Sequence, residues 1–328
     1  MLDRLTSLFR TPKPAAPAAP AAKPPQYYSQ FGGLWVDRLD AGDVLAAKVA
    51  HDSKAAALKD KLAFFIKNGY VILEQAVAHD DIDAYQRDLQ GATRGGSPLQ
   101  ASVPVAGPQD KSVVPLEEAD INKPLTKVLD TYVHLKSAHR LIYSRPIVDF
   151  LKLVFEENIL AFQGLHFERG STQAVHQDTA YVVLEQPMAL CASWIALEDV
   201  RPGSGELIYY PGSHRLPDWL YSGTHKHFNH ERDKHEEHLA HLKALNDRSL
   251  ESGLKLQSFL PKKGDALIWA ADLAHGGSEI TDTSLTRRSL VTHYTGASQV
   301  PYYFRFLPKD RQTIVQVEAD CSYCTMYY

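Results

Sequence analysis

Residues 170–183 read Gly-Ser-Thr-Gln-Ala-Val-His-Gln-Asp-Thr-Ala-Tyr-Val-Val. This run places His176 and Asp178 two positions apart among apolar residues. On a β-strand, residues two apart point to the same side with Cα atoms roughly 6.5 to 7 Å apart, so an imidazole and a carboxylate can close on one ion. An ionised aspartate buried beside a histidine would be costly without a metal or a charged partner. The run therefore predicts two metal ligands on one strand.

A third ligand must come from farther along the chain. His275, in Leu-Ala-His-Gly-Gly, is the best candidate, and His166, His214 and His293 are the alternatives. Two histidines and one carboxylate on one face of a metal are typical of non-haem Fe(II) oxygenases. Ligand type alone does not choose among first-row metals, so a zinc or manganese enzyme with the same residues is a second hypothesis.

Two adjacent arginines, Arg287 and Arg288, follow His275 at the start of an apolar run. Neighbouring residues on a strand face opposite ways, so one arginine is expected inside the fold and the other outside. An arginine grips a carboxylate through two charge-assisted hydrogen bonds, which suits an oxidisable dicarboxylate co-substrate. The alternative for either arginine is a surface ion pair.

The composition excludes several classes of function. The 35 basic and 39 acidic residues of this 328-residue chain give a formal charge of -4, so no basic footprint points to nucleic acid or an anionic membrane. The three cysteines, Cys191, Cys321 and Cys324, form no disulfide framework and suit a cytoplasmic protein with ordinary thiols. No run of 18 apolar residues occurs, so a transmembrane segment is not expected. These features favour a small-molecule substrate.

The pattern along the chain predicts a flexible tail followed by one domain. Residues 1–30 are rich in proline and alanine, and the first ten form a weak docking segment at most. Residues 31–328 are expected to form a single domain, with a C-terminal extension at about 312–328. Helices are predicted at 45–68, 80–89, 125–139 and 147–155, a strand at 70–73, and a long binding loop at 91–115.

From residue 160 onward, short apolar runs alternate with turns. Such runs predict a double-stranded β-helix, or jelly-roll barrel, with the preceding helices covering one sheet. The fold class is therefore mainly β with flanking helices. The predicted strands are 160–169, 174–184, 188–197, 206–211, 266–270, 285–294 and 302–307.

An insertion at 219–252 interrupts the strands. It contains a charged helix, predicted at 231–247, and six histidines: His225, His227, His230, His235, His238 and His241. Histidines three apart on a helix face could form a second metal site. The zinc pattern H-E-x-x-H is absent, however, so a solvated helical lid over the barrel mouth is the favoured interpretation.

An ordered set of motifs resembles the phytanoyl-CoA dioxygenase family of Fe(II)/2-oxoglutarate-dependent oxygenases. The resemblance covers most of residues 60–296. Its motifs are Asn-Gly-Tyr-Val-Ile-Leu (68–73), Gly-Ser-Thr-Gln-Ala-Val-His-Gln-Asp (170–178), Ala-Ser-Trp-Ile-Ala-Leu-Glu-Asp-Val (192–200), Gly-Ser-Gly-Glu-Leu (203–207), Tyr-Pro-Gly-Ser-His-Arg (210–215) and Gly-Asp-Ala-Leu-Ile-Trp (264–269), with His275 and Arg287.

The resemblance implies that His176, Asp178 and His275 hold Fe(II) and that Arg287 binds 2-oxoglutarate. One departure keeps Arg288 as an alternative, because the segment from His275 to the arginines is one residue longer than the commonest family spacing.

Three further residues are expected near the co-substrate by the same resemblance. Trp194 matches a family tryptophan, Gln173 lies near the same site, and Ser278 follows the third ligand closely. They complete the set of expected co-substrate contacts.

The reaction implied is hydroxylation of a small-molecule or carrier- or sugar-linked substrate by O2, with release of succinate and CO2. Halogenating relatives lack the carboxylate ligand that Asp178 supplies, which favours hydroxylation. Desaturation, cyclisation and epimerisation use the same ligands and stay open, as does a non-catalytic module that senses metal or 2-oxoglutarate.

Overall fold

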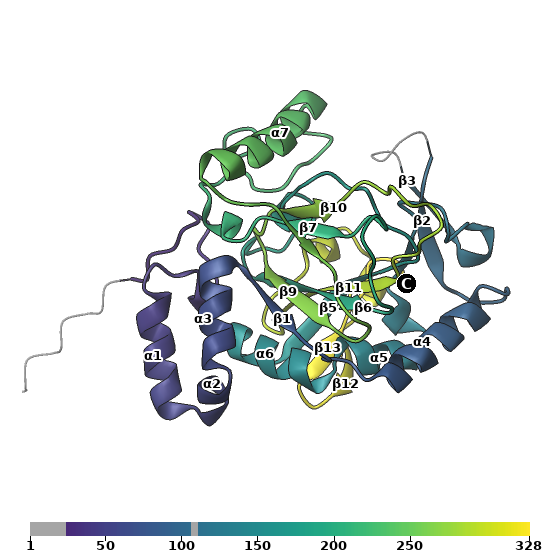
Figure 1. Cartoon of the computed structure of the whole chain (residues 1–328), viewed down its shortest axis with the longest axis horizontal. Coiled ribbons are helices and arrows are strands. Elements are labelled where there is room, and N and C mark those ends of the chain that lie inside the picture. The colour runs from purple at the N-terminus through teal and green to yellow at the C-terminus, as the bar shows by residue number, and fades with distance from the viewer. Residues whose placement is uncertain (1–23, 106–110) are drawn as a thin grey trace, which may run out of the picture.

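A computed structural model of the chain describes residues 24–105 and 111–328 (Figure 1). The docking segment expected at residues 1–10, and most of the tail expected up to residue 30, lie outside the described residues. Among the described helices, none is long and apolar enough to cross a membrane.

Ten strands form one large sheet, in which neighbouring strands run antiparallel except for one parallel pair. The parallel pair joins β5 to β13, so the C-terminal segment is part of this sheet. The path of the sheet is β1 (Tyr70–Leu73), β9 (Ala266–Ala270), β6 (Leu190–Ala196), β11 (Ser289–Gly296), β5 (Ile159–Phe167), β4 (Lys127–Leu129), β2 (Gln100–Pro104) and β3 (Lys111–Pro115), with β12 (Val315–Glu318) paired to β13 (Cys321–Tyr323).

A second sheet of three strands lies across one face of the first (Figure 1). Its order is β10 (His275–Gly277), β7 (Leu207–Tyr209) and β8 (Gln257–Phe259). Alternate residues of the large sheet point toward it: in β6, Trp194 packs in the cluster between the sheets, and Ile195 packs on the opposite side. Among the described residues, no strand pairing joins the two sheets, so the jelly-roll is a double layer.

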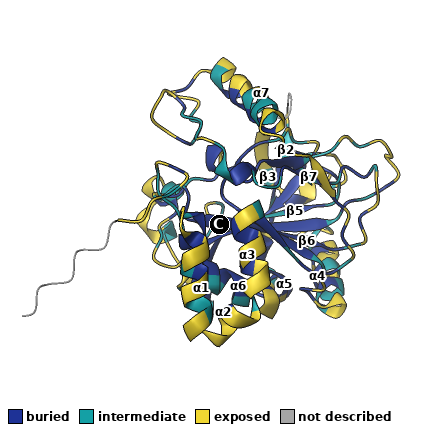
Figure 2. Cartoon of the chain, turned by 60° about the vertical axis from the view of Figure 1, so that its left-hand side comes forward, coloured by how far each residue is buried: buried dark blue, intermediate teal, exposed yellow. Residues whose placement is uncertain are grey.

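Helices cover the outer face of the large sheet (Figures 1 and 2). Their apolar sides join the outward residues of β1, β6, β9 and β11 in the main core, and their other sides are exposed. The structure thus confirms the predicted fold class. These helices are α1 (Ala41–His51), α2 (Ser53–Ala57), α3 (Lys59–Asn68), α4 (His79–Ala92), α5 (Lys136–Ile142) and α6 (Arg145–Phe155), and α7 (His235–Glu251) stands apart at the far end.

Two of the predicted N-terminal elements are wrong. The helix expected at 45–68 is three helices, because the Asp52 carboxylate accepts from the backbone N–H of Lys54 and begins a new helix there. Within the loop expected at 91–115, residues 100–104 and 111–115 pair as the strands β2 and β3. In both cases local capping and strand pairing override the broad pattern.

Three later predictions also fail. The helix expected at 125–139 begins instead with β4, because Val128 and Leu129 pair with β5 and Asp130, in the left-handed region at φ 40°, turns the chain. The strand expected at 302–307 is a 3-10 helix, Tyr302–Arg305. The strand expected at 174–184 is not continuous: it has isolated bridges at His176 and at Leu184, with a 3-10 turn, Asp178–Ala180, between them.

Candidate metal centre

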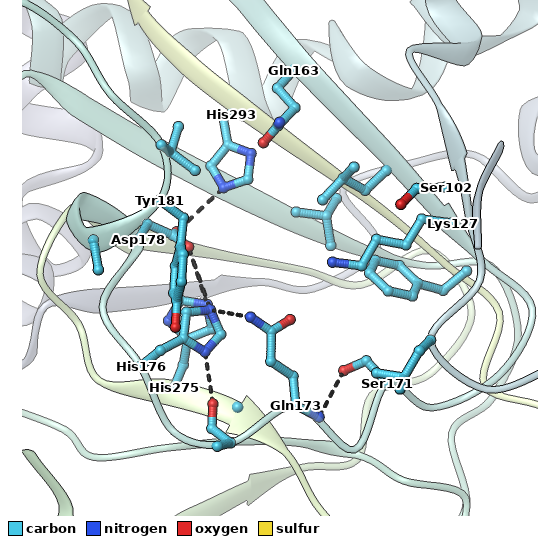
Figure 3. Close-up of a pocket in the computed structure, with 18 of the residues that line it drawn as sticks. Ser102, Lys127, Gln163, Ser171, Gln173, His176, Asp178, Tyr181, His275 and His293 are labelled. Atoms are coloured by element: carbon cyan, nitrogen blue, oxygen red, sulfur yellow. Dashed lines mark hydrogen bonds and ion pairs between the residues drawn. The ribbon is translucent and has the colours of Figure 1, made fainter. Parts of the chain in front are cut away.

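A cavity of about 570 Å³ opens between the two sheets (Figure 3). Both sheets, the β2–β3 hairpin, the histidine-rich insertion and the C-terminal segment contribute to its wall. His176, Asp178 and His275 lie on one side, and Lys127 and Ser102 lie on the other (Figure 3).

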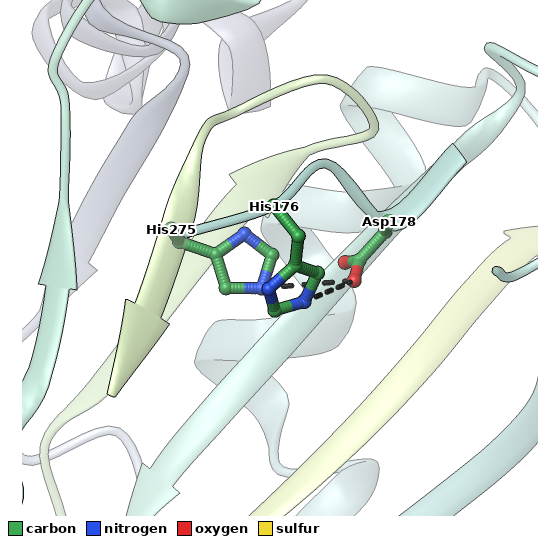
Figure 4. A group of neighbouring side chains, drawn as sticks. All are labelled: His176, Asp178 and His275. Carbon is green, nitrogen blue, oxygen red and sulfur yellow. Dashed lines mark ion pairs between the residues drawn. The ribbon is translucent and has the colours of Figure 1, made fainter. Parts of the chain in front are cut away.

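His176, Asp178 and His275 form the only buried group of potential metal ligands found among residues 24–105 and 111–328 (Figure 4). One ligand atom from each lies within 4.8 Å of the others. The Asp178 Oδ1 is 3.7 Å from the Nε2 of His176 and 3.6 Å from the Nε2 of His275. Such an arrangement could hold a divalent metal ion.

The two histidines are held together by their backbones. The His176 N–H donates to the His275 carbonyl at 2.8 Å, and the His275 N–H donates to the His176 carbonyl at 2.9 Å. This bridge extends the small sheet by one residue pair, next to β10. Asp178 reaches the pair from the 3-10 turn, so a turn, and not the alternation of a continuous strand, brings it beside His176.

Hydrogen bonds also fix which ring nitrogen of each histidine is free. The Nδ1 of His176 lies 2.8 Å from the Ala174 carbonyl, and the Nδ1 of His275 lies 2.9 Å from the Leu273 carbonyl. A carbonyl only accepts, so each Nδ1 carries a proton, and Nε2 is the nitrogen of each ring that can offer a lone pair to a metal. Burial lowers the pKa of His275 to about 4, which keeps its ring neutral at pH 7.

The second oxygen of Asp178 faces away from these two nitrogens. The indole N–H of Trp269 donates to Oδ2 at 2.7 Å, and the Nε2 of His293 lies 3.3 Å from the same oxygen. Burial alone would raise the pKa of Asp178, but positive charge on the surrounding histidines, His275 first, lowers it well below its usual range. The Oδ1 atom of Asp178 is directed at the Nε2 atoms of His176 and His275.

The Trp269→Phe variant is expected to bind a divalent metal about 10- to 100-fold more weakly, because such partners orient a ligating carboxylate. The unpaired Oδ2 should also lower the free energy of unfolding by about 1–3 kcal/mol. Titration with Co(II) and thermal unfolding measure the two effects. Trp194→Phe is the matched control, since the Trp194 indole N–H has no partner to lose. Equal Co(II) affinity in both variants would contradict the assigned hydrogen bond.

The alternative histidines do not complete the ligand set. His166 bonds with the Tyr85 hydroxyl at 3.2 Å, and the Nε2 of His214 bonds with the Ile66 carbonyl at 3.2 Å. His293 also lines the cavity, but it lies beside the Oδ2 of Asp178, whereas His176 and His275 lie beside Oδ1. Neither ring nitrogen of His293 makes a hydrogen bond of good geometry. His275 is the histidine that meets the pair.

Arg287 points into the cavity, whereas Arg288 points out. Arg287 is 2 % exposed, its guanidinium carbon lies 5.4 Å from the centre of the Trp194 ring, and its Nε has no hydrogen-bond partner. Burial lowers its pKa to about 10, so it stays charged at pH 7. Arg288 donates to Glu168 at 2.8 Å. Arg287 is therefore a buried cation for which no carboxylate among the described residues lies within ion-pair distance.

Lys127 is a second cavity cation, which the sequence analysis missed. It sits on β4 and is 9 % exposed, with its ammonium 5.4 Å from the centre of the Phe167 ring. Burial, followed by the charge of Lys111, lowers the pKa of Lys127 to about 7. Its signal in the sequence was a lone lysine in the apolar run 125–129, which was assigned to a helix.

Two of the other three expected co-substrate contacts line the cavity, and one does not. Gln173 lines the cavity with its side-chain Nε2 3.2 Å from the Nε2 of His176, and Trp194 lines it with an unpaired indole N–H. Ser278 does not line the cavity, because the chain turns away after β10 and its backbone N–H donates to the Glu206 carbonyl. The expectation for Ser278 is therefore not supported.

Comparison with known proteins agrees with the motifs. The family model described as Phytanoyl-CoA dioxygenase (PhyH) matches residues 65–289. The peroxisomal phytanoyl-CoA dioxygenase of Homo sapiens is 22 % identical over 249 residues, which cover 71 % of this chain and 67 % of the human protein. The probable phytanoyl-CoA dioxygenase of Caenorhabditis elegans is 22 % identical over 162 residues, and the match spans only about half of that protein.

Solved structures share the fold. The epimerase SnoN from nogalamycin biosynthesis, described as dependent on alpha ketoglutarate (2-oxoglutarate), superposes with a TM-score of 0.55 at 18 % identity, over 75 % of this chain and 85 % of SnoN. EctD from S. alaskensis, solved with 2-oxoglutarate and 5-hydroxyectoine, gives a TM-score of 0.52 at 17 % identity, over 76 % of this chain and 79 % of EctD. At these identities the likeness shows a common fold.

Proposed function

The chain belongs to the phytanoyl-CoA dioxygenase family, and from that premise we propose that it is an Fe(II)/2-oxoglutarate-dependent oxygenase that hydroxylates a small molecule. The observation that carries the proposal is the pairing, in one buried cavity, of converging metal-ligand atoms with an arginine that lacks a carboxylate partner. Either feature alone would suit many kinds of protein, but together they match the needs of a metal and a dicarboxylate.

The residues present fit Fe(II). Two imidazole Nε2 atoms and one carboxylate oxygen converge, and hydrogen bonds hold both Nδ1 atoms and the second carboxylate oxygen on the far side. The Gln173 amide lies 3.2 Å from the Nε2 of His176 and would move aside when that nitrogen binds a metal. Family membership, and not the ligand types, favours iron over zinc or manganese.

The residues also fit 2-oxoglutarate. Arg287 offers a guanidinium for a carboxylate, Lys127 offers a second positive charge when protonated, and Trp194 offers a free indole N–H. An unpaired buried charge is costly, so a dicarboxylate that neutralises it gains affinity. We assign the co-substrate to Arg287 and not to Arg288, because Arg288 is already paired with Glu168.

When bound, iron and 2-oxoglutarate would supply O2-dependent oxidation of a substrate C–H bond, with succinate and CO2 as co-products. The protein's own residues orient the ligand side chains and exclude water from the cavity. Trp269 holds Asp178 in one orientation, and the backbone bridge holds His176 against His275. The rings of Trp194 and Phe167 flank Arg287 and keep water from its charge. A cavity of about 570 Å³ suits a small molecule.

The proposal is tested by adding Fe(II) and then 2-oxoglutarate to the protein without O2. A weak visible charge-transfer band is expected only when both are present. Admission of O2 should then release succinate, slowly without a substrate and faster with a correct one. A folded, metal-loaded protein that gives no band and no succinate would refute the proposal.

Lys127 should make co-substrate affinity depend on pH. Its pKa of about 7 means that the attracting ammonium is lost as pH rises, so the Kd for 2-oxoglutarate should increase above pH 7. The Kd increases by up to about tenfold per pH unit. The increase ends when the pH exceeds the pKa of Lys127 in the complex, which is higher than in the free protein because a carboxylate lies beside the ammonium. Titrations from pH 6 to pH 9 measure it. The Lys127→Met variant should give a flat profile, and an equal slope in both proteins would contradict the assignment.

The same lysine gives a stability prediction of defined sign. The ordinary lysine pKa of 10.5 applies to the unfolded chain, so between pH 7 and pH 10.5 the unfolded chain binds more protons than the folded one. The cost of burying the Lys127 ammonium therefore falls as pH rises through this window, so the metal-free protein gains unfolding free energy, and Lys127→Met should remove that slope.

A further inference from the structure

The histidine-rich insertion, residues 219–252, reaches the metal centre from outside the two sheets. Its Phe228, His230 and Leu242 line the same cavity as His176. The Phe228 N–H donates to the carbonyl of Ala180, the last residue of the turn that carries Asp178, at 3.0 Å. The insertion is thus attached to the ligand-bearing segment and does not simply lie over it.

A buried histidine makes a second attachment. The His238 ring is 0 % exposed, with Nε2 3.1 Å from the Tyr181 hydroxyl and Nδ1 2.9 Å from the Tyr221 hydroxyl. One tyrosine donates and the other accepts, because a neutral imidazole has one N–H and one lone pair. The Tyr181 ring in turn lies 5.4 Å from the ring of His176. This contact fixes the wall of the cavity beside the histidine ligand.

The strongest attachment is a buried ion cluster. The Lys226 ammonium, in the insertion, contacts both Asp272 and Asp218, and the side chains of Lys226 and Asp272 are each 2 % exposed. Burial would lower the pKa of Lys226, but the two carboxylates raise it above its ordinary value. Asp218 also accepts from the Ser29 hydroxyl at 3.1 Å. One cation of the insertion therefore neutralises two carboxylates from different parts of the chain.

Asp272 connects this cluster to both ligand-bearing segments. It lies between β9 and β10, three residues before His275. The Thr179 hydroxyl donates to its Oδ1 at 2.6 Å, and the Gln177 amide donates to its carbonyl at 2.9 Å. Thr179 and Gln177 are the two chain neighbours of Asp178. The Asp178 turn and the segment leading to His275 are therefore both tied to Asp272.

We propose that Lys226 is a positioning residue for the metal centre, through which the insertion holds the Asp178 turn and the His275 segment in register. This inference rests on the proposed function, because it assigns a role at the same ligands. Without Lys226, the carboxylates of Asp272 and Asp218 are two buried negative charges that have lost their shared counter-ion. Their repulsion and the cost of their burial decrease only if the carboxylates move apart or water enters. Either change pulls on Thr179 and so on Asp178.

The test compares Co(II) binding to the full-length protein and to Lys226→Met. We expect the variant to bind Co(II) at least about tenfold more weakly, in the range for residues that orient metal ligands, with an altered visible Co(II) absorption spectrum. Lys152→Met is the control, because it also breaks a lysine–aspartate ion pair, with Asp320, but touches neither the cavity nor the ligands. It should leave Co(II) affinity and spectrum unchanged.

Two further variants keep the test decisive if Lys226→Met folds poorly. Thr179→Val removes only the hydroxyl link to Asp272 and should weaken Co(II) binding to a smaller degree. The double variant Lys226→Met/Asp272→Asn removes one of the two stranded charges, and should recover part of the lost affinity because an amide oxygen still accepts from Thr179.

The possible outcomes separate this inference from the proposed function. Wild-type protein that binds no Co(II) or Fe(II) overturns the proposed function. Wild-type protein that binds metal, with Lys226→Met and Thr179→Val matching its affinity and spectrum, overturns the role of Lys226 alone. A lower melting temperature with unchanged metal binding also overturns it, since that is the result of a purely structural ion pair.

Discussion

The Asp178→Ala variant is expected to bind Fe(II) more than about 100-fold more weakly than the wild type and to release no succinate from 2-oxoglutarate. A residue that merely orients a metal ligand changes metal affinity by about 10- to 100-fold when it is lost, and the loss of a ligand itself should cost more. Alanine also leaves the Trp269 indole N–H without an acceptor, so the metal-free protein should lose about 1–3 kcal/mol of unfolding free energy. Metal titration, succinate release and thermal unfolding give the three quantities.

The Asp178→Asn variant separates charge from packing. Asparagine keeps the size of the side chain and an oxygen that accepts from Trp269, so its stability should stay closer to that of the wild type. Its metal affinity should nevertheless fall strongly, because the negative charge directed at the two imidazoles is gone. Asp310→Ala, at an exposed position, is the control for the measurements. Full succinate release by Asp178→Ala would rule out Asp178 as a ligand.

The Arg287→Met variant is expected to keep its metal affinity but to lose 2-oxoglutarate. Removing one partner of a buried charge-assisted contact costs about 2–5 kcal/mol, which corresponds to an affinity loss of about 30- to 4000-fold. The metal-free variant should be at least as stable as the wild type, because methionine replaces a buried cation that lacks a carboxylate partner. Lower co-substrate affinity together with equal or higher stability distinguishes a binding residue from a structural one.

Arg288→Met is the matched control, since the two arginines are adjacent on the same chain segment. Its side chain is 41 % exposed and paired with Glu168, so its loss should cost about 1 kcal/mol or less and leave 2-oxoglutarate binding unchanged. The reverse result, with Arg288→Met losing the co-substrate and Arg287→Met retaining it, would reassign the contact to Arg288.

The fold class was predictable because its evidence is local and repeated. β1 and β9 were predicted at their observed bounds, since each is a compact apolar run that begins directly after a glycine or charged residue, Gly69 or Asp265. The helix at 125–139 was wrong because the pairing of β4 with β5 is a contact between distant residues. Leu125 to Leu129 carries no local mark of that pairing, and its apolar spacing fits a helix equally well.

The candidate site shows the same limit at finer scale. His176, Asp178 and His275 could be named from their motifs, but the prediction placed Asp178 on a strand, whereas a 3-10 turn carries it. Lys127 could not be assigned to the cavity, because its position depends on a strand that the sequence analysis did not find. The attachment of Lys226 to Asp272 joins residues 46 positions apart, and a histidine count in the insertion gives no hint of it.

The backbone bridge between His176 and His275 means that the three candidate ligands are not held in place in the same way. The backbones of His176 and His275 are joined directly by two hydrogen bonds, whereas Asp178 reaches them from the 3-10 turn that follows His176. Loss of the Asp178 carboxylate therefore leaves the backbone link between the two histidines intact. A small anion supplied in solution, such as formate, should therefore partly restore metal binding to Asp178→Ala, and it should not do so for a variant that has lost either histidine.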